Sequence, residues 1–147
     1  MLPVLLDMES LFEMFVAEWM KRNVPDGYLV RAQENVPLPL GQSVSIDVDI
    51  TIEDRISGRT VLVLDTKYKA PEQSATADIG QVVAYAEAKN CRRAVLVYPA
   101  PLRREISGYW GNHIHVESLP FRLDGNLEDA GDEFLKRLLP RDWHDDH

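Results

Sequence analysis

Several common features are scarce or missing in this chain, and each absence excludes a class of protein. A single cysteine, Cys91, excludes an internal disulfide and a cysteine-based metal cluster, and it suits a reducing compartment. No apolar run approaches the roughly 20 residues of a membrane-spanning helix, and residues 1–6 lack the basic start of a signal peptide. No glycine-rich phosphate loop ending in Lys-Ser or Lys-Thr is present, so nucleotide hydrolysis is not expected here. We therefore expect a cytoplasmic protein without a membrane segment.

A basic surface is missing as well. The chain carries 16 Lys and Arg against 24 Asp and Glu, a formal charge of −8, and no basic stripe runs along it. Phosphate backbones attract basic surfaces. This chain alone should therefore hold a nucleic acid only weakly. Much of the acidic excess lies near the C-terminus, at Glu128, Asp129, Asp132, Glu133, Asp142, Asp145 and Asp146.

The length and composition suit one globular domain. With 147 residues, 45% of them hydrophobic, the chain is long enough to bury a sizeable core. No internal repeat or low-complexity segment interrupts it. We expect a single domain over residues 1–140, followed by a loose acidic tail over residues 141–147.

The most informative stretch is residues 60–69. An apolar run over residues 61–64 follows a Ser-Gly turn signal and predicts a buried strand. It ends abruptly in Asp65, Thr66 and Lys67, and strand alternation places Asp65 and Lys67 on one face. One interpretation is an ion pair at a strand end. The other is a site in which Asp65 binds a divalent cation while Lys67 handles a water molecule or a developing charge.

A second strand is predicted just upstream, over residues 43–53. Ile46, Val48, Ile50 and Ile52 alternate with Asp47, Asp49 and Thr51, which predicts an apolar face and a polar one. A hairpin through residues 55–59 would bring Asp49 close to Asp65. Two such carboxylates repel each other unless a cation lies between them, and Mg²⁺ prefers oxygen ligands. Asp47 shares the polar face and is a rival ligand.

The N-terminal helix adds two further carboxylates. Asp7 is a plausible N-cap for a helix that runs to about residue 22. Its apolar face is formed by Met8, Leu11, Phe12, Phe15 and Trp19. Glu9 and Glu13 lie one turn apart on the edge of that face. The helix dipole accounts for Glu9, which is in the first turn, whereas Glu13 lies beyond it.

The remaining patterns complete a mixed α/β fold. They predict a strand over residues 28–37, a helix that starts between residues 75 and 78 and ends near residue 90, a strand over residues 92–99, a turn over residues 109–112, an edge strand over residues 113–119, and a helix over residues 126–139. A helix that leads directly into a buried strand indicates a right-handed crossover and a parallel neighbour. His113 and His115 share a strand face, which reads as an exposed polar face because no third zinc ligand is in view.

Four segments together resemble a known family. They are residues 6–16 (LDMESLFEMFV), the pair Asp49-Ile50, residues 64–69 (LDTKYK) and residues 78–86 (DIGQVVAYA). In this order they resemble the PD-(D/E)XK nuclease superfamily, and within it the nuclease domain of McrC, the cleaving subunit of McrBC modified-cytosine restriction systems. The resemblance covers nearly the whole chain. One position departs: Val48 stands where the family usually has proline, a residue that shapes the backbone but binds no metal.

The resemblance implies a fold and an activity. The fold would be a restriction-endonuclease-like α/β core, a central mixed sheet flanked by helices in the order α-β-β-β-α-β, with an extra edge strand and a C-terminal helix. The activity would be Mg²⁺-dependent or Mn²⁺-dependent hydrolysis of phosphodiester bonds in DNA, methylated or not. An McrB-like GTPase subunit would be the partner. Alternatives are another nuclease of the superfamily, acting in repair or in mobile elements, and a silent interaction module of the same fold.

The resemblance also assigns roles to individual residues. Asp49, Asp65 and Glu13 would be the metal-binding acids, with Glu9 as the substitute for Glu13. Lys67 would act electrostatically and by positioning, because the neighbouring carboxylates favour its charged form. Gln81 and Tyr85 lie one turn apart on the helix that follows, and they would line the site, with Gln81 fixing the lysine, the water or a phosphate. Lys69 is either a phosphate contact or a solvated charge.

Overall fold

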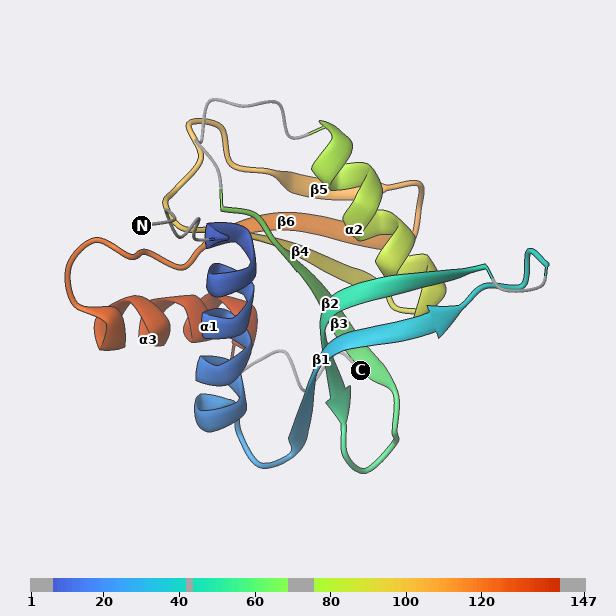
Figure 1. Cartoon of the computed structure of the whole chain (residues 1–147), viewed down its shortest axis with the longest axis horizontal. Helices are drawn as coiled ribbons and strands as arrows, with labels where there is room; N and C mark the ends of the chain where they lie inside the picture. The colour runs from blue at the N-terminus through green and yellow to red at the C-terminus, as the bar shows by residue number, and fades with distance from the viewer. Residues whose placement is uncertain (1–6, 42–43, 69–75, 141–147) are drawn as a thin grey trace, which may run out of the picture.

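A six-stranded mixed sheet forms the centre of the computed structural model, which describes residues 7–41, 44–68 and 76–140 (Figure 1). The elements along the chain are α1 (Met8–Asn23), β1 (Tyr28–Pro37), β2 (Ser45–Asp54), β3 (Thr60–Thr66), α2 (Thr76–Ala88), β4 (Arg93–Tyr98), β5 (Ser107–Trp110), β6 (Ile114–Pro120) and α3 (Leu127–Leu138). The strands lie in the order β1-β2-β3-β4-β6-β5. Neighbours β3, β4 and β6 run parallel, and the other pairs are antiparallel. The predicted mixed α/β sheet with flanking helices is confirmed.

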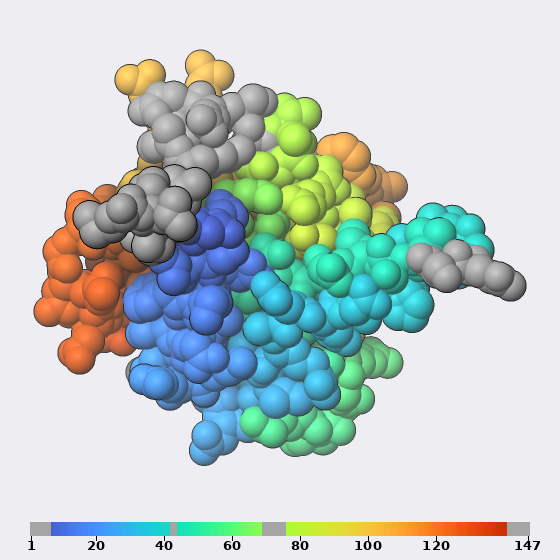
Figure 2. Space-filling model, in the orientation of Figure 1, coloured from blue at the N-terminus to red at the C-terminus, as the bar shows by residue number. Residues whose placement is uncertain are grey.

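Helices cover both faces of the sheet because buried side chains alternate along its central strands. On β3, Leu62 and Leu64 pack in a core with α1 and α3, whereas Val63 packs in a second core with α2. In the space-filling view, α1 lies between α3 and the β1–β2 hairpin, so this face of the sheet is covered (Figure 2). The carboxyl end of β3 therefore lies between α1 on one side and α2 on the other.

The first helix starts where the sequence predicts. The Asp7 carboxylate accepts hydrogen bonds from the backbone N–H and the hydroxyl of Ser10, as an N-cap does. The apolar face is shifted from the prediction, because Met8 and Leu11 are exposed. The buried residues of α1 are Phe12, Val16, Ala17 and Met20. None of the described helices combines the length and the hydropathy that a membrane crossing requires.

The edge of the sheet differs from the prediction. The strand expected at the edge, residues 113–119, is β6 and lies inside the sheet between β4 and β5. The true edge strand is β5, whose last two residues were assigned to a turn. All four residues of β5 are exposed. Alternation of apolar residues indicates which face of a strand is buried, but not which strands pair with it. It therefore could not show that β5 pairs with β6.

The faces of β2 also differ from the prediction. Ile50 and Ile52 lie in the core with α1, but Val48 is buried in the core with α2. The expected common face for these residues is therefore wrong. Directly across the ladder, Gln33 on β1 has a left-handed backbone with φ of 52°. Register runs from Ala32 opposite Ile50 to Glu34 opposite Val48, so this irregular residue lies level with Asp49.

Candidate carboxylate site at the end of β3

The two aspartates that the sequence pairs do lie together. Pairing between β2 and β3 ends with Ile50 opposite Leu64, and Asp49 and Asp65 are the next residues along each strand. Beyond that point the backbone N–H of Thr66 donates to Asp49 Oδ2 at 3.2 Å instead of to a strand partner. The hairpin therefore brings two carboxylates side by side where its strands separate.

Asp65 is the most unusual polar group at this point. Its side chain is fully buried, and neither oxygen has a hydrogen-bond partner among the described residues. The Lys67 ammonium lies 3.6 Å from Asp65 Oδ2. Burial, followed by the adjacent Asp49 carboxylate, raises the pKa of Asp65 to about 9. Buried polar groups normally have a hydrogen-bond partner. The Asp65 oxygens are an exception, which makes Asp65 a candidate ligand for a cation.

A chain of hydrogen bonds from α2 connects the lysine to the first aspartate. Lys67 Nζ donates to Gln81 Oε1 at 2.7 Å, and Gln81 Nε2 donates to the Tyr85 hydroxyl at 2.9 Å. The Tyr85 hydroxyl in turn donates to Asp49 Oδ1 at 3.5 Å. Burial raises the pKa of Tyr85 well above its usual range, so its hydroxyl keeps its proton. The structure thus brings Gln81 and Tyr85 to the predicted carboxylates.

The two glutamates of α1 approach from the opposite side. Glu9 Oε2 accepts the backbone N–H of Tyr68 at 2.7 Å, which fastens the segment after β3 to α1. Glu13 Oε1 accepts the amide of Gln33 at 3.2 Å. Burial, and then the charge of Asp49, raise the pKa of Glu13. Glu13 therefore lies within electrostatic reach of the pair, whereas Glu9 holds the backbone beside it.

One other predicted residue lies outside this group. The carboxylate of Asp47, the rival ligand, points away and accepts the Asn35 amide at 2.7 Å on the exposed part of the hairpin. Lys69 lies outside the described residues, as does the acidic tail over residues 141–147.

Sequence reasoning missed two residues near the site. Gln33 appeared as an ordinary strand residue, and no pattern could show its left-handed backbone. Asp78, at the predicted start of the second helix, is buried and accepts the Tyr98 hydroxyl at 2.9 Å. Its charge also contributes to the raised pKa of Asp65. The apolar surroundings of Asp78 in the sequence were the available signal.

The donor set fits a divalent cation. Asp49 and Asp65 offer carboxylate oxygens, and hard cations such as Mg²⁺ bind oxygen and keep several water ligands. Within residues 7–41, 44–68 and 76–140, no three His, Cys, Asp or Glu side chains converge closely enough to hold a metal by themselves. Two protein carboxylates, completed by water, backbone or substrate oxygens, are therefore the available arrangement. The unsatisfied Asp65 oxygens are the observation that favours it.

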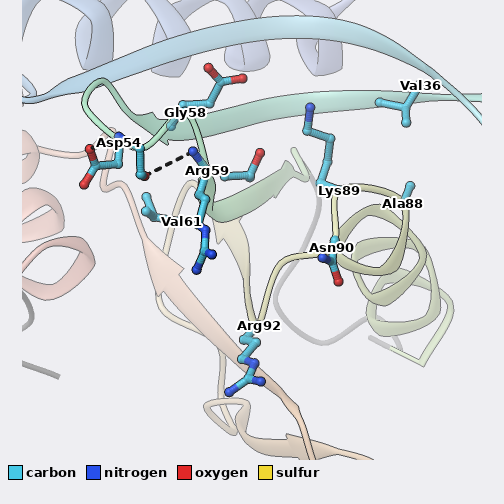
Figure 3. A pocket seen from close by; sticks show the side chains of 12 residues that line it. Val36, Asp54, Gly58, Arg59, Val61, Ala88, Lys89, Asn90 and Arg92 are labelled. Carbon is cyan, nitrogen blue, oxygen red and sulfur yellow. Dashed lines mark hydrogen bonds between the residues drawn. The ribbon is translucent and has the colours of Figure 1, made fainter. Parts of the chain in front are cut away.

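One cleft of the described surface is remote from these residues. It has a volume of about 1230 Å³ and lies at the opposite end of β3, beside Thr60, Val61 and the start of β4. Figure 3 shows Arg59 and Arg92 among the residues that line it. None of the predicted site residues that the structure describes lines this cleft, so it does not mark the carboxylate site.

Comparisons with known proteins agree with the fold and the motifs. The family model described as "McrBC 5-methylcytosine restriction system component" matches residues 1–99. Among solved structures, the chain is similar to one in the refined half-complex from a tetradecameric assembly of Thermococcus gammatolerans McrB AAA+ hexamers with bound McrC. That match has a TM-score of 0.69 and 17% identity, and covers 91% of this chain and 34% of that one. No curated protein matches. Because the family model covers two thirds of its length, this chain belongs to the family of McrBC 5-methylcytosine restriction system components.

Proposed function

We propose that this chain is a DNA-cleaving component of a modification-dependent restriction system, with a restriction-endonuclease-like core that hydrolyses phosphodiester bonds with a divalent cation. The observation that carries the proposal is Asp65: a fully buried carboxylate with unsatisfied oxygens, beside Asp49 and Lys67 at a strand end. A protein that needed only an ion pair here would satisfy those oxygens with backbone or side-chain donors. Membership of the McrBC family supports the same conclusion.

Asp49 and Asp65 would hold the cation, Mg²⁺ or Mn²⁺, and Glu13 would add negative charge from α1. When bound, such a cation lowers the pKa of a water molecule and neutralises charge that develops on the phosphate. The Thr66 N–H holds Asp49 in place, and the Tyr85 hydroxyl restrains its other oxygen. Asp65 itself has the Lys67 ammonium 3.6 Å away and the Asp49 carboxyl beside it, so a cation would bind its oxygens by displacing the proton that its raised pKa retains.

Lys67 would stabilise the negative charge on the scissile phosphate and orient the attacking water. Its ammonium lies between Asp65 and Gln81, 3.6 Å from Oδ2 of the first and 2.7 Å from Oε1 of the second. An ammonium in this position suits electrostatic stabilisation of the phosphate better than proton abstraction. Gln81 would fix the lysine side chain, and Tyr85 would fix Gln81 in turn.

A partner is also part of the proposal. The solved relative is described as McrC bound to McrB AAA+ hexamers. This chain spans about a third of the relative's length, and its net charge is −8. We propose that an McrB-like GTPase partner supplies the grip on DNA that an acidic chain lacks.

The test is calorimetric titration of the whole chain with Mn²⁺ and with Mg²⁺. We expect binding by the wild type and loss of binding in Asp65→Asn, which keeps the shape of the side chain but removes its charge. Asp47→Asn is the matched control, because this exposed carboxylate is on the same hairpin but outside the site. It should bind as the wild type does. Cleavage of cytosine-methylated plasmid DNA, with the McrB-like partner and GTP, should be lost in Asp65→Asn alone.

Equal affinity in the wild type and Asp65→Asn would contradict the two-carboxylate site. No binding by the wild type, with or without a short DNA duplex, would contradict the enzyme proposal and favour a silent module of the same fold.

A further inference from the structure

Gln33 has a backbone conformation that its residue type does not explain. Its φ of 52° lies in the left-handed region, and Asn90 is the other described non-glycine residue with a positive φ. Asn is several-fold enriched in that region, whereas Gln is not. Glycine would adopt the same backbone without a steric cost. The side chain of Gln33 must therefore contribute something that glycine could not.

The position of this residue in the sheet is specific. Gln33 falls level with Asp49, between the pairs Ala32–Ile50 and Glu34–Val48. On either side of Asp49, Ile50 packs in the core with α1 and Val48 packs in the core with α2. The irregular backbone thus coincides with the point where Asp49 leaves the regular ladder to reach Thr66 and Tyr85.

The side chain of Gln33 reaches the same site from the other direction. Its amide Nε2 donates to Glu13 Oε1 at 3.2 Å, and Glu13 is partly buried on α1. The next residue, Glu34, faces the other helix and bonds Lys89 at 2.7 Å. This part of β1 is therefore contacted from both sides of the sheet, at Glu34 by Lys89 just after α2 and at the Gln33 amide by Glu13 of α1.

We propose that Gln33 is a positioning residue of the carboxylate site, whose left-handed backbone shapes the strand opposite Asp49 and whose amide holds Glu13 toward the bound cation. Strained residues persist where the surrounding structure over-determines them, and they cluster at functional sites. This inference rests on the proposed function, because it assumes that Asp49 and Asp65 hold a cation.

Two substitutions separate the backbone from the amide. Gln33→Gly removes the amide and relieves the strain, whereas Gln33→Ala removes the amide and keeps the strain. We expect both variants to lose about tenfold in Mn²⁺ affinity by calorimetry, as is typical when an outer group that supports a metal site is removed, because Glu13 would no longer be held where its charge acts on the cation. Gln33→Gly should nevertheless unfold at a temperature equal to or above that of the wild type, and Gln33→Ala at a lower one.

Asn90→Gly is the matched control, since it relieves the same backbone conformation at the far end of α2. It should bind Mn²⁺ as the wild type does. Wild-type affinity in Gln33→Gly would overturn the inference, and so would a joint loss of affinity and thermal stability in that variant, which a purely structural role predicts. If the wild type itself bound no Mn²⁺, the proposed function would fail first, and this inference with it.

Discussion

Two aspartates at strand ends of the same hairpin have opposite surroundings. Asp54, at the end of β2, accepts the backbone N–H groups of Ile56 and Ser57 at 2.8 and 3.1 Å, and so it closes the turn. Asp65, at the end of β3, is buried and receives no hydrogen bond from the described residues. In the sequence, both are acids near the end of a predicted strand. The difference shows that hydrogen-bond satisfaction separates a structural carboxylate from a candidate ligand.

Removing the charge of Asp65 should produce the largest effect. The raised pKa means that, without metal, the contribution of Asp65 to stability is fully present below its unfolded pKa of 3.8 and is lost as pH rises towards about 9. The slope can reach about 1.4 kcal/mol per pH unit. Asp65→Asn lacks this ionisation, so it should exceed the wild type in free energy of unfolding by a margin that grows with pH. Urea denaturation in EDTA from pH 4 to pH 9 measures this margin, and parallel curves for the two proteins would refute it.

Substituting Lys67 should affect catalysis far more than stability. Lys67→Met keeps the aliphatic stem but removes the ammonium beside Asp65 and Gln81. We expect cleavage to slow on the order of 100-fold or more, because a preorganised charge is lost from the site. The ammonium also lowers the pKa of Asp65 against the larger effect of burial. Without metal, the stability of this variant should therefore keep falling at a pH where that of the wild type has levelled off. A single-turnover rate close to that of the wild type would remove Lys67 from the mechanism.

Substituting Asp54 should give the opposite result from Asp65. Asp54→Ala removes the acceptor of two turn N–H groups, and each such bond contributes about 1 kcal/mol. We expect thermal and urea unfolding to show a loss of about 2 kcal/mol. Mn²⁺ affinity should stay at the wild-type value. If Asp54→Ala weakened Mn²⁺ binding as much as Asp65→Asn, the distinction between the two aspartates would not hold.

The sequence predicts the positions of these residues better than their environments. Strand alternation and a short hairpin turn are enough to place Asp49 beside Asp65, and helical spacing is enough to place Gln81 beside Tyr85. Both relations are local. The left-handed backbone of Gln33, the buried contact between Asp78 and Tyr98, and the strand that covers β6 depend on tertiary packing. No periodicity encodes that packing, and these features became visible only in three dimensions.

Substituting Tyr85 should give the smallest effect, and it tests whether the hydroxyl that connects Gln81 to Asp49 matters for cleavage. Tyr85→Phe keeps the buried ring in the core with α2 but removes the hydroxyl between Gln81 and Asp49. The variant loses the 2.9 Å bond from Gln81 and the long 3.5 Å contact to Asp49, so stability should fall by about 1 kcal/mol. The Gln81 amide loses its acceptor, so Lys67 should become less well fixed and the cleavage rate should fall about tenfold at unchanged KM for DNA.

Val83→Ala, on the same helix, is the control: it should lower stability more and the cleavage rate less. If the two variants lost rate in proportion to stability, Tyr85 would be a core residue and the hydrogen-bond chain from Lys67 to Asp49 would carry no function.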